Sequence, residues 1–110
     1  MEKKKRELVY AKYNGKCAYC GNPIEYEDLK VDHIIPEKKG GTDDIENLMP
    51  ACETCNHYKG HSNLFKFKHM MKSIHKKISK LYIIKVALRF GLIKIKEFDS
   101  FYYEKKDLNQ

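Results

Sequence analysis

The stretch "VDHIIPEKKGGTDDIENLMPACETCN", residues 31–56, decides the fold of this chain. Its candidates for a catalytic site are four polar residues, Asp32, His33, Asn47 and Asn56. A Cys-x-x-Cys pair stands directly before the last of them, and a second pair, "CAYC", occupies residues 17–20. Two such pairs are typical of a tetrahedral zinc site. The pattern predicts a hairpin that is held by zinc and carries a catalytic site.

The cysteines favour a structural metal over the other uses of thiols. Zinc would be bound by Cys17, Cys20, Cys52 and Cys55. The first ten residues, "MEKKKRELVY", lack the apolar stretch of a secretory signal, so we expect a soluble, cytoplasmic protein without disulfides. Four sulfur ligands leave no open coordination position, which predicts a structural zinc. A redox role for either pair is the alternative.

The spacing of the two pairs shows that something is inserted between them. The 31 residues that separate them exceed the usual zinc-ribbon gap, which is about 15–20 residues. The whole chain of 110 residues is short enough to predict one domain, residues 1–110. We expect a core at about 6–60 and a basic, mainly helical extension at about 61–110. No apolar run has the length of about 18 residues that a membrane span needs.

The net charge of +7 is unevenly distributed. Residues 1–16 carry six Lys or Arg against two acids, residues 17–60 four against nine, and residues 61–110 twelve against four. Basic flanks around an acidic centre predict a polyanion as the partner, with a cation between the acidic centre and the polyanion. The alternative is that the lysines are solvated helix faces.

Local patterns predict a fold of the α+β class. We expect a helix at residues 2–13 that stops at Asn14–Gly15, and a strand at 29–36. Gly40–Gly41 would be the pivot of a hairpin whose return strand lies in 45–52. A helix would start at 52 and end at Gly60.

The C-terminal part has a different pattern. Apolar residues recur at helical spacing after Ser62, which predicts one long helix as far as Arg89 or Phe90 with Gly91 as its stop. Its broad apolar face makes a homodimer one option. The tail at 92–106 fits a strand or a helix.

The polar residues of the central stretch suggest hydrolysis assisted by a metal ion. Asp32 and the amide oxygen of Asn56 would hold a divalent cation, and oxygen ligands suit Mg²⁺. His33 would accept a proton from the attacking water. Asn47 would either orient the His33 ring or brace the loop that carries it.

These motifs in this order resemble the HNH endonuclease family, in its zinc-bound ββα-metal form. The resemblance covers about residues 6–60 and rests on the two Cys-x-x-Cys pairs, Gly21, Asp32-His33-Ile34-x-Pro36, Gly40-Gly41, Asn47-Leu48 and Asn56-x-x-Lys59. It implies a ββα core that binds one divalent cation and hydrolyses DNA phosphodiesters, leaving 5′-phosphate and 3′-hydroxyl ends. It also implies His33 as general base, Asp32 as metal ligand and Asn47 as the residue that positions His33.

One departure from the family pattern concerns the metal. The residue after the last cysteine is often His in this family, and Asn56 at that position favours Mg²⁺ over softer ions. His57 and His61 could bind a softer metal or contact phosphates, and Lys59 is expected to contact phosphate or to lie in solvent. The competing function is a non-catalytic, zinc-stabilised module that binds nucleic acid through its basic flanks.

Overall fold

The computed structural model of the protein describes residues 1–108. It contains two compact units, one formed by Met1–Leu64 together with the segment that begins at Ser100, and the other by Phe65–Asp99. The expected single domain, residues 1–110, stays a prediction. None of the helices formed by residues 1–108 has the length and apolar character needed to span a bilayer.

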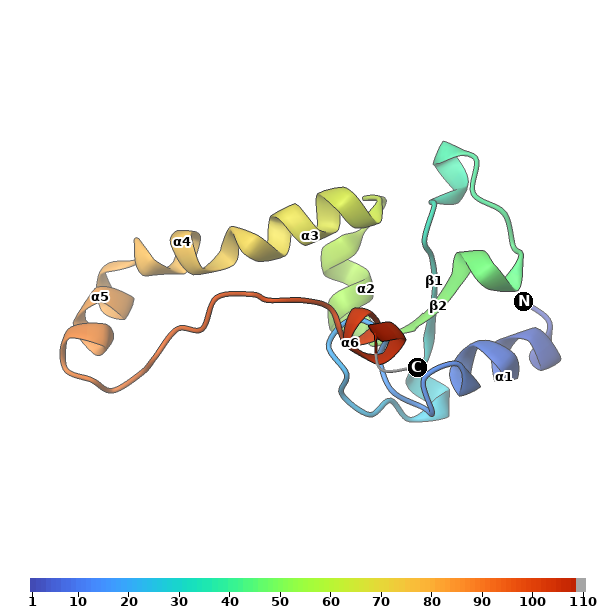
Figure 1. The fold of residues 1–110 in the computed structure, drawn as a ribbon, viewed down its shortest axis with the longest axis horizontal. Helices are drawn as coiled ribbons and strands as arrows, with labels where there is room; N and C mark the ends of the chain where they lie inside the picture. Colours follow the sequence, from blue (N-terminus) through green and yellow to red (C-terminus); the bar gives the residue numbers. More distant parts are fainter. Residues whose placement is uncertain (109–110) are drawn as a thin grey trace. The chain divides into compact units, whose positions relative to one another are not determined.

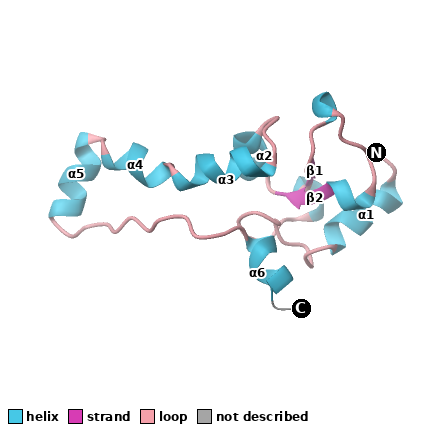
Figure 2. Ribbon diagram, turned by 45° about the horizontal axis from the view of Figure 1, so that its top comes forward, coloured by secondary structure: helices cyan, strands magenta, loops and turns pink. Residues whose placement is uncertain are grey.

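The centre of the first unit is a ββα element, as the motifs predicted. β1 (Lys30–His33) pairs with β2 (Leu48–Ala51) in an antiparallel register that sets His33 opposite Leu48. α2 (Glu53–Lys59) follows directly and contacts β1, while α1 (Lys3–Ala11) contacts β2 (Figures 1 and 2). Both strands are shorter than expected. β1 ends at His33, and a 3₁₀ turn at Ile45–Asn47 occupies the start of the expected return strand.

The loop between the strands is built from two 3₁₀ turns, Glu37–Lys39 and Ile45–Asn47. Gly40 ends the first turn in the left-handed region, with φ 91°. Gly41 lies so close to the preceding chain that a Cβ atom there would stand 1.6 Å from the Ile35 carbonyl oxygen. The two glycines therefore make the predicted pivot for different reasons, one conformational and one steric.

The first cysteine pair lies on a tight knuckle after α1. Asn14 and Gly15 both take positive φ and end the helix as predicted. The Cys17 amide bonds to the Asn22 carbonyl at 2.9 Å, which closes the knuckle. A further 3₁₀ turn, Tyr26–Asp28, leads into β1.

The C-terminal segment belongs to the first unit. α6 (Tyr102–Leu108) begins beside the knuckle, where the Tyr103 amide donates to the Ala18 carbonyl at 2.7 Å. Gly21 allows this approach, since a Cβ atom there would lie 2.7 Å from the Tyr102 ring. Of the two options for this part of the tail, the helix is confirmed.

Side chains from α1, the knuckle, the segment that leads into β1, the strand β2 and the C-terminal segment form the core of the first unit. These buried apolar residues are Val9, Cys17, Ala18, Tyr19, Ile24, Leu29, Leu48, Met49, Ala51 and Phe101. A core this small gains much from a bound metal, because small domains bury a modest share of their surface.

The second unit is helical, as expected, but its helix is interrupted. α3 (Leu64–Lys72) is followed by α4 (Ile74–Ser79) and α5 (Tyr82–Arg89), in place of one helix to Arg89. Two serine hydroxyls donate back to main-chain carbonyls, Ser73 to Met70 at 2.9 Å and Ser79 to His75 at 2.5 Å. Such bonds bend helices, and Leu81 then turns to extended backbone before α5. Gly91 follows the last helix with φ 71°, as predicted.

We expect Gly41→Ala to destabilise the protein by more than about 2 kcal/mol, because the added methyl group must displace the main chain at Ile35. Gly40→Ala should cost only about 1 kcal/mol, the usual cost of a left-handed alanine. Chemical denaturation of both variants measures the difference. Equal losses would contradict the close contact between Gly41 and Ile35.

Candidate active site

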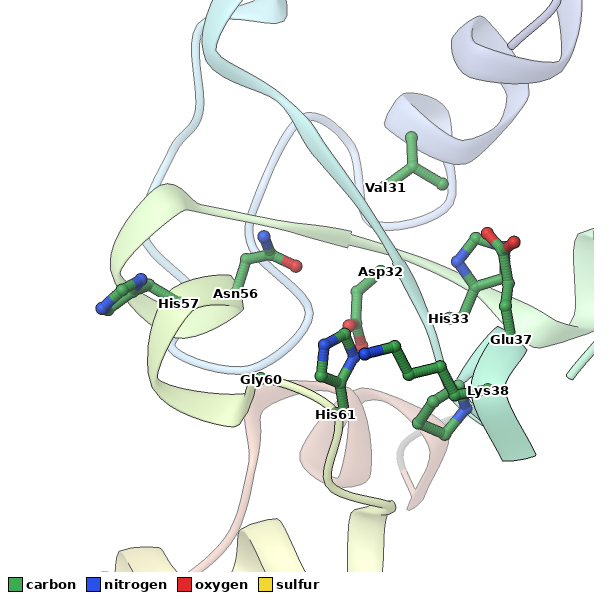
Figure 3. A pocket seen from close by; sticks show the side chains of 10 residues that line it. Val31, Asp32, His33, Glu37, Lys38, Asn56, His57, Gly60 and His61 are labelled. Atoms are coloured by element: carbon green, nitrogen blue, oxygen red, sulfur yellow. The ribbon is translucent and has the colours of Figure 1, made fainter.

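A cavity of about 530 Å³ opens between β1, the start of the loop and α2. Its lining residues include Asp32, His33, Glu37, Lys38, Asn56, His57 and His61. Three of the four predicted catalytic residues therefore meet there, the aspartate and histidine from β1 and Asn56 from α2 (Figure 3). The fourth, Asn47, is not part of the lining.

The His33 ring is held by two carboxylates from the loop. Its Nε2 atom lies 2.7 Å from Oδ1 of Asp43 and 3.2 Å from Oε1 of Glu37. The hydrogen bond with His33 lowers the pKa of Asp43. Figure 3 shows the Glu37 carboxylate beside the ring, with the visible ring nitrogen turned toward the side where Asp32 and Asn56 lie. This arrangement fixes the ring through one nitrogen and directs the other into the cavity.

Asp32 is buried and bonded to two side chains. The Tyr19 hydroxyl donates to its Oδ2 at 2.5 Å, and the Lys59 ammonium lies 3.2 Å from Oδ1 and 3.1 Å from Oδ2. Burial raises the pKa of Asp32, and the contacts with Tyr19 and Lys59 oppose that shift. The pKa of Tyr19 is raised as well, chiefly by its own burial, so the hydroxyl keeps its proton and acts as the donor.

The surroundings of Lys59 correct the expectation for this residue. It is only 1% exposed, and its ammonium also donates to the His33 carbonyl at 3.0 Å. The expectation of a lysine in solvent or on phosphate was wrong, because α2 points this side chain at the one buried carboxylate of β1. Lys59 is thus the counter-ion of Asp32.

The donors at Asp32 leave room for a metal ion. A carboxylate offers about four acceptor positions, and Tyr19 and Lys59 use three contacts, two of them on Oδ2. A carboxylate and the Asn56 amide oxygen at one cavity form the hard-oxygen set that suits Mg²⁺. The residues present therefore fit a divalent cation.

Asn47 braces the loop, one of the two roles expected for it. Its Oδ1 accepts from the Ile35 amide at 2.9 Å, and its Nδ2 donates to the carbonyls of Ile35 at 3.1 Å and Thr42 at 2.7 Å. It fixes the backbone two residues beyond His33 and the loop that carries Asp43. Asn47 therefore joins the main chain on both arms of the loop.

The four cysteines gather in one group, with their sulfur atoms within 4.8 Å of one another. Sγ of Cys20 lies 3.9 Å from Sγ of Cys52. Four sulfurs around a zinc ion at about 2.3 Å would stand roughly 3.8 Å apart. A hydrogen bond with Cys55 lowers the pKa of the Cys17 thiol, and Cys17 in turn raises that of Cys55. The group has the composition and size of a metal site.

The two other histidines of the cavity differ in direction. Figure 3 shows His61 turned toward Asp32 and His57 turned away from the centre. Gly60 ends α2 between them with φ 56°, as expected, so they do not share one helix face.

The sequence reading missed the residues that hold Asp32 and His33 in place. For Tyr19 the available signal was its position inside the first cysteine pair, and for Lys59 its place four residues after Cys55 on the same helix. For Glu37 the signal was its position four residues after His33. Asp43 had no signal beyond the acidity of the loop.

Comparison with known proteins points to one family. Residues 17–62 match the family model described as HNH endonuclease. The CRISPR-associated endonuclease Cas9 of Corynebacterium diphtheriae is 44% identical over 50 residues, which are 44% of this chain and 5% of that protein. The SPbeta prophage-derived protein YoqL of Bacillus subtilis is 30% identical over 99 residues, 80% of this chain and 40% of its own.

A solved structure agrees with these matches. The crystal structure of the Type II-C Cas9 enzyme from Actinomyces naeslundii superposes with a TM-score of 0.54 and 29% identity over 59% of this chain and 8% of that one. The chain thus spans less than half the length of each of these relatives.

Lys59→Met should destabilise the protein by about 3 kcal/mol at pH 8, because it leaves the buried Asp32 carboxylate without its counter-ion. The folded-state pKa of Asp32 is already raised. The cost of burying the ionised Asp32 carboxylate is therefore absent below the pKa that Asp32 has in the unfolded state. It grows as the pH rises through the pKa that Asp32 has in the folded state. The deficit of the variant should be smaller at pH 4.5 than at pH 8.

Denaturation of the zinc-loaded protein without added Mg²⁺ measures this deficit at both values. Lys30→Met, at an exposed lysine of β1, serves as the matched control and should change stability by less than about 0.5 kcal/mol. A deficit for Lys59→Met that does not depend on pH would argue against the ion pair.

Proposed function

We infer the function of this chain from its membership of the HNH endonuclease family, which it holds through residues 17–62. We propose that it is a metal-dependent endonuclease that hydrolyses phosphodiester bonds in DNA. The observation that carries the proposal is the meeting of Asp32, His33 and Asn56 at one cavity. A proton acceptor and two oxygen ligands are the groups that such hydrolysis requires.

In this proposal His33 takes the proton of the attacking water. Its Nε2 is engaged by Asp43 at 2.7 Å, so Nδ1 is the basic nitrogen toward the cavity. Asn47 keeps the main chain at Ile35 in place through two hydrogen bonds, which holds the end of β1 that carries the imidazole. General-base catalysis of this kind contributes about 10²–10⁴ in rate, provided that the ring is in place.

Asp32 and Asn56 hold the divalent cation, which we take to be Mg²⁺. The bound ion supplies positive charge to the scissile phosphate and the leaving oxygen. Asp32 presents a carboxylate whose orientation is set by Tyr19 and Lys59, and Asn56 adds a neutral oxygen from α2. The cavity wall from β1 and α2 thereby aligns the ion and the base on one substrate.

The cysteine group binds a structural zinc in this proposal. It joins the knuckle at Cys17 and Cys20 to the N-terminus of α2 at Cys52 and Cys55. Asn56 is the next residue of α2, and Tyr19 lies inside the first pair. The zinc therefore holds together the elements that place the oxygen ligands of the second metal, without taking part in the reaction.

Both flanks grip the nucleic acid in a largely sequence-independent way. Residues 1–16 have a net charge of +4 and residues 61–110 one of +8. Lysine contacts with phosphates give affinity that falls steeply with salt. The acidic centre, with a net charge of −5 over residues 17–60, accepts DNA once the cation is bound.

His33→Ala should lower the rate of plasmid nicking by about 10³-fold, because the variant lacks the proton acceptor. Nicking by wild-type protein should require Mg²⁺ and stop with EDTA. The measurement is conversion of supercoiled to open-circular plasmid, with zinc content and the far-UV spectrum taken on the same samples.

His57→Ala is the matched control. It removes another imidazole that lines the cavity, but one that points away from the centre of the cavity. Its rate should remain within about threefold of wild type. If wild-type protein binds the plasmid but leaves it intact with Mg²⁺, Mn²⁺ and Ni²⁺, the non-catalytic binding module is the better description.

We expect the purified protein to contain one zinc ion per chain, and its removal to unfold the first unit. Binding of structural zinc contributes roughly 10–16 kcal/mol of apparent free energy that is coupled to folding. Elemental analysis measures the content, and circular dichroism follows a titration with a strong zinc chelator. Added Mg²⁺ should not restore the signal, whereas added zinc should. A folded, zinc-free protein would contradict the structural role.

A further inference from the structure

Tyr19 links the cysteine knuckle to the candidate active site. It stands between Cys17 and Cys20, is only 4% exposed, and donates its hydroxyl to Oδ2 of Asp32 at 2.5 Å. Nothing in the cysteine chemistry requires a tyrosine at this position. The contact with Asp32 gives the residue a role of its own.

The C-terminal segment packs against Tyr19. The Tyr102 amide donates to the Tyr19 carbonyl at 3.0 Å. The Phe101 ring meets the Tyr19 ring edge-on at 5.4 Å and 70°, and the Tyr103 ring does so at 6.2 Å and 84°. Phe101 is itself only 2% exposed. Residues about 80 positions away in the sequence thus fix both the main chain and the ring of Tyr19.

The two donors at Asp32 are of different kinds. Lys59 reaches both carboxylate oxygens at 3.1–3.2 Å with a single ammonium at the end of a flexible side chain. Tyr19 reaches one oxygen from a rigid ring that packs edge-on against the Phe101 and Tyr103 rings. The hydroxyl is neutral, so it orients the carboxylate without adding charge beside it, whereas the ammonium supplies charge.

We propose that Tyr19 is a positioning residue that orients Asp32 toward the divalent cation, and that residues 100–108 serve the active site by holding Tyr19. This inference rests on the proposed function, in which Asp32 is a ligand of the catalytic ion. It assigns a task to a segment that lies outside residues 17–62, the part that matches the family model.

The test is Tyr19→Phe in the full, zinc-loaded chain, which keeps the packed ring and removes only the hydroxyl. Binding of Mn²⁺ is measured by calorimetry without DNA, with Asp32→Ala defining the Asp32-dependent part. Loss of an outer-shell partner typically costs 10–100-fold in metal affinity. We expect Tyr19→Phe to weaken Mn²⁺ binding about tenfold, to raise by a similar factor the Mg²⁺ concentration needed for half-maximal nicking, and to leave DNA affinity unchanged.

Tyr26→Phe is the control for hydroxyl removal, because Tyr26 packs against Tyr10 at 5.3 Å and is not among the residues that line the cavity. It should bind Mn²⁺ as wild type does. Phe101→Leu is a second route to the same result, since it loosens the Tyr19 ring and keeps the hydroxyl, and it should weaken Mn²⁺ binding about threefold on the same scale.

Two results would overturn the inference. One is Mn²⁺ binding by Tyr19→Phe that equals wild type, and the other is wild-type protein without any Asp32-dependent Mn²⁺ binding. Failure of the proposed function looks different. In that case wild type binds Mn²⁺ through Asp32 but cuts no plasmid, and the comparison of Tyr19→Phe with wild type still decides the positioning role.

Discussion

The approach of four cysteine sulfurs to within 4.8 Å is the constraint on which the rest of the first unit depends. It joins a knuckle near the N-terminus to the first turn of α2, across an insertion of 31 residues. The hairpin of β1 and β2 is only four residues long on each strand, and a hairpin of that size has little stability by itself. The group of four cysteines and the residues packed around it supply the stability that the hydrogen bonds of the short sheet cannot provide.

Electrostatics at Asp32 follow from the same scaffold. A carboxylate that is 5% exposed would be expelled or protonated without partners, and α2 brings Lys59 to it while the knuckle brings Tyr19. Both partners come from elements that the cysteine group fixes. The partners of His33 have another origin, because Asp43 and Glu37 belong to the loop that Asn47 closes. The partners of Asp32 thus depend on the cysteine group, whereas the partners of His33 depend on the side-chain amide of Asn47.

The sequence predicted the part of the fold that short motifs determine. The ββα core, the cysteine group and the stops at Asn14–Gly15, Gly60 and Gly91 are confirmed, since each depends on local spacing or backbone geometry. The burial of Lys59 and the return of Phe101 to the knuckle could not be predicted, because both depend on tertiary packing between distant segments. The interruption of the long helix depends on serine hydroxyls that bond to the helix backbone, which apolar periodicity does not reveal. The roles of Asp32, His33, Asn47 and Asn56 in chemistry stay predictions.

The hydrogen bonds that Asn47 makes divide the loop into a base that is fixed and a tip that tolerates change. Its side chain bonds to Ile35 on one arm and Thr42 on the other, so the base of the loop is closed. Lys38 and Lys39 lie beyond that closure, on a 3₁₀ turn followed by Gly40, where added side-chain bulk meets nothing within 4 Å. Changes in length or charge at this tip can accumulate without moving the strand that ends at His33.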